Sequence, residues 1–118
     1  MDIKEIPFAQ EAIKKAVGNG EIEFYNFSPR NKDGMKKLEL KVYYSNGRRK
    51  IIVLHDAALQ ITSEEAVVNE FKGREERNWE IRRLYYECGI SQNFLANFFG
   101  ISQPSVSVIV KRHKTVQG

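Results

Sequence analysis

The chain has 118 residues, of which 42% are hydrophobic and 29% charged, the proportions of a folded globular protein rather than of a disordered tail. No apolar run approaches the roughly 18 residues that a spanning helix needs, and the first residues lack a signal-peptide core. The single cysteine, Cys88, excludes an internal disulfide and a paired-cysteine zinc site. We therefore expect a cytoplasmic protein that has no contact with a membrane and needs no metal or other cofactor.

The net charge of +4 is distributed unevenly along the chain. Residues 1–73 carry 12 Lys or Arg and 11 Asp or Glu, whereas residues 74–118 carry seven and four. The stretch from Cys88 to Gly118 has no acidic residue. A segment without carboxylates can approach a polyanion without repulsion, so the charge pattern favours a nucleic-acid partner for the second part.

The first part of the chain shows one helical pattern and three strand-like runs. The helical pattern begins at Pro7 and ends at the glycines of residues 18–20. Alternation of apolar and polar residues, or a continuous apolar run, then predicts strands at 22–27, 37–44 and 50–55. Asn46-Gly47 favours a tight hairpin with two positive-φ positions between the last two strands.

The end of the first part is predicted to be helical. Thr62-Ser63 followed by Glu64-Glu65 is typical of a helix cap, and the helix is expected to run to about Phe71. Residues 1–73 are therefore predicted to form an α-β-β-β-α module with a small antiparallel sheet. The charged segment 72–76 is expected to be the hinge to a second domain at 74–118.

Three helices are predicted in residues 74–118. The first begins near Arg77 and stops at Gly89, and Ser91 caps a second from Gln92 to Phe99. Ser102 caps the third, whose first turn tolerates Pro104. Ala96 permits a close crossing of the two short helices around Gly100. The expected shared core consists of Leu95, Phe99, Ile101, Val106 and Ile109, covered by Ile81, Leu84, Tyr85 and Cys88.

The phrase Gly-Ile-Ser-Gln-Pro-Ser-Val-Ser at 100–107 is similar to the turn and recognition helix of a known family. With Ala96, Gly100 and the apolar positions in register, residues 77–113 resemble the prokaryotic trihelical helix-turn-helix family. That family includes repressors, the DNA-binding domains of resolvases and transposases, and the promoter-reading region of sigma factors. The resemblance implies that the domain at 74–118 is an all-α helix-turn-helix. Together with the module predicted at 1–73, it leads us to expect an α+β fold for the chain.

The resemblance also implies roles for individual residues, because the second helix of this motif enters the major groove. The expected base-reading residues are Gln103, Pro104, Ser105, Ser107 and Val108. Gln103 suits adenine, and Val108 suits a thymine methyl group. The expected phosphate-contacting residues lie at helix N-termini or in the basic C-terminal stretch: Ser91, Gln92, Ser102, Lys111, Arg112 and Lys114.

Four aromatic residues are predicted to form an interface. Helical periodicity places Phe94 and Phe98 on one face outside the core, where two exposed phenylalanines need a cover. Trp79 and Tyr86 share the outer face of the preceding helix. Since no arginine lies in the first two turns of the reading helix, binding by one copy is expected to be modest, which favours a homodimer.

Together these features predict a transcriptional regulator that binds double-stranded DNA specifically, as a homodimer on an operator. Residues 1–73 would supply dimerisation or bind a protein partner or a small ligand. One alternative is a DNA-binding accessory of a mobile-element recombination, replication or partition system. Another is a phage- or plasmid-type protein inhibitor that also represses its own gene.

An enzyme is not expected. Asp33 with Glu39 and Lys41 is similar to the pattern of metal-dependent nucleases, but the aspartate lies only six residues upstream. Alternating lysine and glutamate is equally typical of a solvated strand face.

Overall fold

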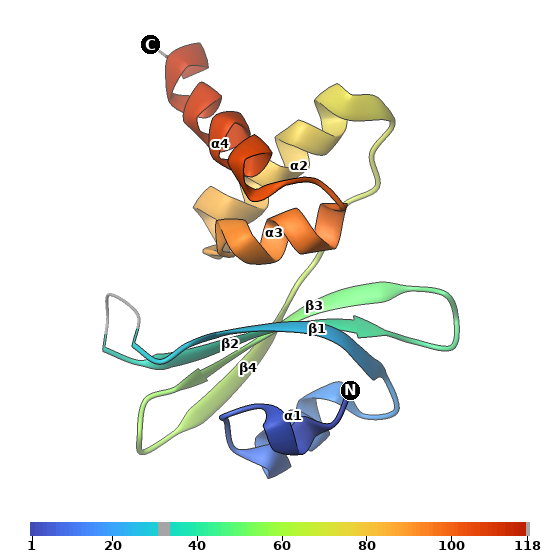
Figure 1. Ribbon diagram of the computed structural model, residues 1–118, viewed down its shortest axis with the longest axis vertical. Coiled ribbons are helices and arrows are strands. Elements are labelled where there is room, and N and C mark those ends of the chain that lie inside the picture. The colour runs from blue at the N-terminus through green and yellow to red at the C-terminus, as the bar shows by residue number, and fades with distance from the viewer. Residues whose placement is uncertain (31–33, 118) are drawn as a thin grey trace. The chain divides into compact units, whose positions relative to one another are not determined.

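The computed structural model describes the backbone of residues 1–30 and 34–117, and the side chains within these ranges as far as Arg112. The chain has an α+β fold in which an antiparallel sheet is followed by helices (Figure 1). It divides into two compact units, Met1–Val67 and Val68–Gly118, here called the sheet unit and the helical unit. The predicted boundary at residue 73 lies six residues after this division. No helix in the described part of the chain has the length and apolar character needed to cross a bilayer.

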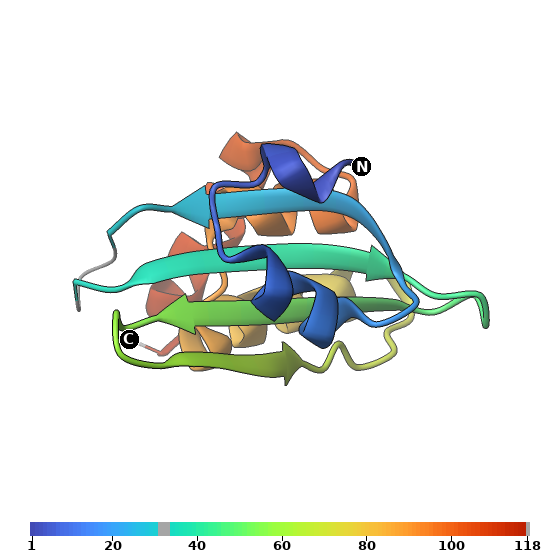
Figure 2. The ribbon, with the colours of Figure 1, turned by 90° about the horizontal axis from the view of Figure 1, so that it is seen from below.

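The sheet unit is a four-stranded antiparallel meander in the order β1-β2-β3-β4. It begins with the short 3-10 helix η1 (Ile3–Glu5) and α1 (Gln10–Val17), and its strands are β1 (Glu21–Ser28), β2 (Lys36–Tyr43), β3 (Arg49–Asp56) and β4 (Ile61–Ala66). The three predicted strands are confirmed, with ends that differ by one residue. Helix α1 begins three residues after Pro7, and Figure 2 shows it crossing one face of the sheet.

The core of the sheet unit lies between α1 and that face. Leu38, Leu40 and Val42 alternate along β2, and all three are fully buried against a cluster that includes Ile13 and Val17 of α1. Alternation places every second side chain of a strand on one face, which explains why this pattern was readable in the sequence. The Tyr44 hydroxyl donates to the Val17 carbonyl at 2.9 Å and ties the end of α1 to the sheet.

The predicted helix from Thr62 to Phe71 is wrong, because residues 61–66 form strand β4. β4 pairs with β3 along its length, from Asp56↔Ile61 to Ile51↔Ala66. The run Ile51–Leu54 of β3 is buried, so its backbone groups need hydrogen-bonding partners on both sides. Pairing with β3 therefore decides the structure of these residues against the local capping signal. Burial of β4's own side chains contributes little, because Ala66 is the only buried residue of the strand.

The predicted two-residue hairpin turn at Asn46-Gly47 is also wrong in detail. Gly47 has φ 85°, whereas Asn46 does not have a positive φ. The Tyr44 N–H donates to the Arg48 carbonyl at 2.9 Å, and the Gly47 N–H donates to the Tyr44 carbonyl at 2.9 Å. The loop is therefore one residue longer than a type I′ turn and needs only one left-handed position.

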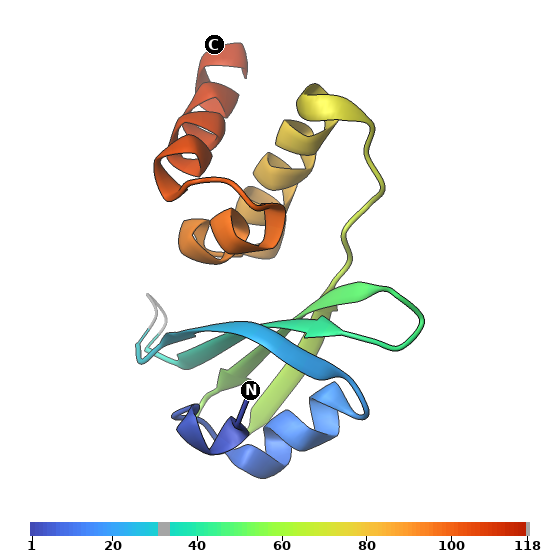
Figure 3. The same ribbon diagram turned by 45° about the vertical axis from the view of Figure 1, so that its right-hand side comes forward.

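The helical unit consists of α2 (Gly73–Cys88), α3 (Gln92–Phe99) and α4 (Gln103–Gln117), shown in Figure 3. The predicted hinge at 72–76 is wrong, because Gly73 begins α2 and the Lys72 N–H donates to the Glu76 carboxylate at 3.1 Å. Helices α2 and α3 end as predicted at Gly89 and Gly100, both in the left-handed conformation.

The three helices pack around one apolar core. Its fully buried members come from all three helices and from the turn before α3: Ile81, Leu84, Ile90, Phe94, Leu95 and Val106. Two side chains of α2 also bind backbone carbonyls of α4. Arg82 donates to Ile109 at 3.4 Å, and the Tyr86 hydroxyl donates to Val110 at 2.8 Å. These contacts set the crossing of α2 and α4, and with it the face of α4 that remains exposed.

Candidate nucleic-acid interface

Helices α3 and α4 begin at the serine caps that the sequence predicts. Ser91 accepts a hydrogen bond from the Phe94 N–H at 3.3 Å, and Ser102 accepts one from the Ser105 N–H at 3.2 Å. The hydroxyls of Ser102 and Ser105 lie 2.8 Å apart. Since Gly100 has φ 69°, the chain can leave α3 and begin α4 within three residues.

The outer face of α4 carries most of the predicted base-reading residues. Gln103, Pro104, Ser105 and Val108 are exposed, and Ser107 is half-buried. Val108 is a large apolar residue of α4 that is 50% exposed. The amide of Gln103 donates to the Gln92 side chain at 3.4 Å, a contact that orients both groups at the start of α4. The four exposed readers, Gln103, Pro104, Ser105 and Val108, therefore lie together in the first two turns of α4.

The predicted phosphate-contacting residues are less uniform. Lys111, Arg112 and Ser102 are exposed, whereas Ser91 and Gln92 are half-buried at the start of α3. The side chain of Lys114 lies outside the part that the structure describes. The described basic groups of α4 itself, Lys111 and Arg112, thus begin about one turn beyond the base-reading positions.

An open groove of about 520 Å³ runs between the start of α2 and the outer face of α4. It is lined by Arg74, Arg77, Asn78 and Arg112, and by Ile101, Pro104, Ser105, Val108 and Ile109. Among the residues that the structure describes, no carboxylate lines the groove. The Arg77 guanidinium donates twice to the Asn78 side chain, at 2.9 and 3.1 Å, which holds it in a fixed orientation. The groove is therefore a positively charged surface beside the exposed face of α4.

Sequence reasoning missed Arg74, Arg77 and Asn78. They precede the helix-turn-helix phrase by more than 20 residues, and Arg74 lies in the charged segment that the sequence predicts to be a hinge. A helical wheel of residues 73–88 puts Arg74 and Arg77 on the same side as the buried Ile81 and Leu84. This placement could have indicated their position, because an arginine beside the buried face of a helix lies near the neighbouring helix.

The expectation that Phe94 is exposed is wrong. Phe94 is 0% exposed, and Phe98 is half-buried with its ring centroid 6.2 Å from that of Phe94. Phe94, Leu95 and Ala96 are three consecutive buried residues, so α3 is covered over a wider arc than one helical stripe. Trp79 and Tyr86, the other proposed interface residues, are exposed on α2.

A buried carboxylate fastens the segment before α2 to the helical unit. Glu80 accepts two hydrogen bonds from Arg83, both at 2.9 Å, and two from Asn69, at 2.8 Å from the backbone and 3.2 Å from the side chain. These bonds, those of Arg83 above all, hold the pKa of Glu80 below its ordinary value despite its burial. The ring of Phe71 also lies 5.8 Å from that of Phe99. The chain is thus ordered against the helices from about Asn69 onward.

The residues of the nuclease-like pattern do not form an open site. Glu39 is 0% exposed, is 3.3 Å from the Lys37 ammonium and accepts a hydrogen bond from Asn26 at 2.9 Å. The expectation that this strand face is solvated is therefore wrong for Glu39. Asp33 lies outside the described residues. Among the residues that the structure describes, no group of three His, Cys, Asp or Glu side chains could hold a metal ion.

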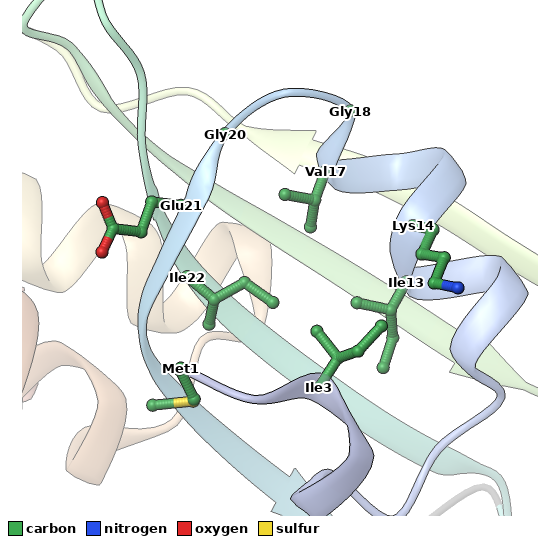
Figure 4. A pocket seen from close by; sticks show the side chains of 9 residues that line it. All are labelled: Met1, Ile3, Ile13, Lys14, Val17, Gly18, Gly20, Glu21 and Ile22. Carbon is green, nitrogen blue, oxygen red and sulfur yellow. The ribbon is translucent and has the colours of Figure 1, made fainter.

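The sheet unit has a small apolar pocket where η1, α1 and the start of β1 meet, with a volume of about 240 Å³. In Figure 4 the side chains of Ile3, Ile13 and Ile22 point toward one another across it, whereas the carboxylate of Glu21 points away. Sites for small molecules usually exceed about 300 Å³ and carry a few converging polar groups. This pocket suits a small apolar group better than a charged ligand.

No protein-family model, curated protein or solved structure matches this chain.

Proposed function

We propose that this chain is a sequence-specific double-stranded DNA-binding protein that acts in the cytoplasm as a transcriptional regulator, with α4 in the major groove. The observation that carries the proposal is the continuity of two surfaces. The exposed polar face of α4 adjoins a groove whose described lining includes Arg74, Arg77 and Arg112 but no carboxylate. A reading face beside fixed cations is what a duplex requires, since base edges and phosphates must be contacted together.

The residue types on α4 suit base edges in the major groove. The major groove of B-DNA is about 12 Å wide and admits one helix, and the side chains near the N-terminus of that helix reach the bases. Gln103 can pair with adenine through N6 and N7, and the exposed Val108 can contact a thymine methyl group. Ser105 is also part of the cap of α4, so its hydroxyl supports the reading face as well as lining it.

The arginines that line the groove would supply the contacts to DNA phosphates. Each phosphate contact releases counterions and steepens the dependence of binding on salt. Arg77 is held by Asn78, and Arg112 lies two turns beyond Ser105 on α4, so the groove offers cations on both of its walls. Glu75, Glu76 and Glu87 belong to α2 but do not line this groove.

The test is DNA binding by the full chain and by two classes of variant, measured at several salt concentrations. Arg77→Ala and Arg112→Ala should weaken binding to all sequences, and each should lower the salt slope by about one for every phosphate that is no longer neutralised. Gln103→Ala should weaken binding at particular base pairs by about 1–3 kcal/mol and leave the salt slope unchanged. Lys15→Ala, which removes an exposed cation of α1, is the matched control and should leave binding unchanged.

The opposite pattern would count against the proposal. If Gln103→Ala lowers affinity equally for every sequence, α4 does not read bases. If Lys15→Ala weakens binding as much as Arg77→Ala, the groove beside α4 is not the DNA-binding surface.

A further inference from the structure

The outer face of α2 has a feature that DNA binding leaves unused. Trp79, the only tryptophan, lies in the middle of the helix and is 65% exposed. Tyr86, two turns later on the same side, is 41% exposed. Trp and Tyr are the side chains most enriched at the centres of protein interfaces, because they bury a large area at low entropic cost. An exposed tryptophan at the centre of a helix face therefore marks a contact surface.

The charged residues around Trp79 are negative before it along α2 and positive after it. Glu75 and Glu76 precede it by one turn, and Arg82 and Arg83 follow it by one turn. At 3.6 residues per turn, Glu75 and Arg82 fall about 40° and 60° to one side of Trp79, and Glu76 and Arg83 fall at similar angles on the other. The face is thus negative at its N-terminal end and positive at its C-terminal end.

Such a face is complementary to itself. Suppose that a second α2 packs antiparallel against the first, with a two-fold axis at Trp79. A residue that precedes Trp79 in one copy then faces a residue that follows Trp79 by a similar distance in the other copy, on the same side of the helix face. Glu75 then faces Arg82 of the second copy, and the relation occurs twice by symmetry. Arg83 is bound to Glu80 of its own chain by two hydrogen bonds of 2.9 Å. Arg82 makes one longer hydrogen bond, 3.4 Å from one terminal nitrogen to the Ile109 carbonyl, and the other N–H groups of its guanidinium can bind Glu75 of the second copy.

We infer that two copies of this chain associate through α2, antiparallel, with the Trp79 rings at the two-fold axis and Glu75 of each copy paired with Arg82 of the other. The chemistry of the face selects this occupant. Two exposed glutamates beside the tryptophan disfavour a nucleic acid or an anionic membrane. A second copy supplies the complementary charges without any further partner. The inference does not depend on the proposed function, because the association needs no DNA.

The first experiment is sedimentation equilibrium of the full chain without DNA, across a wide range of protein concentration. The wild type should shift from monomer to dimer as concentration rises. Trp79→Ala should weaken the dimer by at least about thirtyfold, the size expected for a central tryptophan. Because Trp79 is mostly exposed, its replacement should leave the circular dichroism of the chain unchanged.

A charge-exchange experiment identifies the pairing. Glu75→Arg and Arg82→Glu should each oppose self-association, because each puts like charges opposite each other twice. An equimolar mixture of the two variants should form a heterodimer, because positions 75 and 82 are then both arginine on one copy and both glutamate on the other, so that each pair joins opposite charges. Glu5→Arg, a charge reversal at an exposed position of η1, is the control and should dimerise like the wild type.

Two results would overturn the proposed association through α2. One is a wild type that stays monomeric at every concentration. The other is a dimer that tolerates Trp79→Ala and both charge reversals, because that dimer would use another surface. A mixture of Glu75→Arg and Arg82→Glu that fails to associate, while the wild type dimerises, would refute the antiparallel pairing.

Discussion

Replacing Glu80 by glutamine should destabilise the helical unit substantially. The change keeps the shape of the side chain but removes its charge, and it presents an N–H₂ group to donors that now bind a carboxylate. Glu80 accepts two hydrogen bonds from Arg83 and two from Asn69, and it is almost fully buried. Both the Arg83 ion pair and part of the attachment of the segment before α2 would be lost.

The size of the effect follows from the number and kind of bonds. Hydrogen bonds to charged groups contribute about 1.5–3 kcal/mol each, and breaking a fully buried ion pair costs about 3–5 kcal/mol. The side chain of Arg83 keeps 22% of its exposure and can be partly rehydrated, which reduces the cost. We expect the free energy of unfolding to fall by about 2–3 kcal/mol.

Urea unfolding, followed by far-ultraviolet circular dichroism and by the fluorescence of Trp79, measures this change. Glu70→Gln, at an exposed carboxylate of the same segment, should change the free energy of unfolding by less than about 0.5 kcal/mol. If Glu80→Gln unfolds within about 0.5 kcal/mol of the wild type, the bonds from Arg83 and Asn69 do not stabilise the fold.

The same variant gives a pH dependence with a definite sign. The folded state lowers the pKa of Glu80 from its ordinary value of 4.5, so its stabilising contribution is complete above that value. It is lost as the pH falls from there through the lower folded-state pKa. The gap between wild type and Glu80→Gln should thus be constant from neutral pH down to about 5 and narrow below. A gap that widens as the pH falls would contradict this assignment.

Three further predictions concern the fold around the candidate site and the sheet. Ser102→Ala should lower the stability of the helical unit by about 1 kcal/mol through loss of the α4 cap, measured by urea unfolding, whereas Ser107→Ala, inside the helix, should have a smaller effect. Phe94→Ala should cost about 3–5 kcal/mol and Phe98→Ala clearly less, because only Phe94 of the two is fully buried; equal losses would contradict this burial pattern. Ala58→Gly should raise the midpoint of thermal unfolding, because Ala58 has φ 71° in the β3–β4 turn and glycine removes a strain of about 1 kcal/mol, whereas Ala57→Gly should not.

The sequence predicted the elements whose signals are local. The α3–turn–α4 segment was readable because Ser91, Gly100 and Ser102 are caps and because the apolar positions follow the helical period. Strands β2 and β3 were readable because one alternates strictly and the other is a continuous apolar run. In both cases the residues that decide the structure lie within a few positions of one another.

The elements that were missed depend on distant residues. β4 has a helix-like capping sequence, and it becomes a strand because β3, which is buried, needs a neighbour. The turn before it contains no glycine, and the Asp56 side chain accepts a bond from the Ala58 N–H at 2.8 Å in place of the usual turn signal. The part that Arg74 and Arg77 play in the candidate site depends likewise on the packing of α2 against α4, which no single segment encodes.

The most direct test of the central proposal is selection of bound sequences from a random pool of double-stranded DNA, using the full chain. We predict enrichment of one defined motif, repeated in two halves if the α2 dimer carries two reading helices, and loss of that enrichment in Gln103→Ala. Enrichment of direct repeats without symmetry would favour the recombination or replication accessory over the operator-binding regulator. A pool that shows no enrichment with the folded wild-type chain would contradict the proposal that α4 reads DNA.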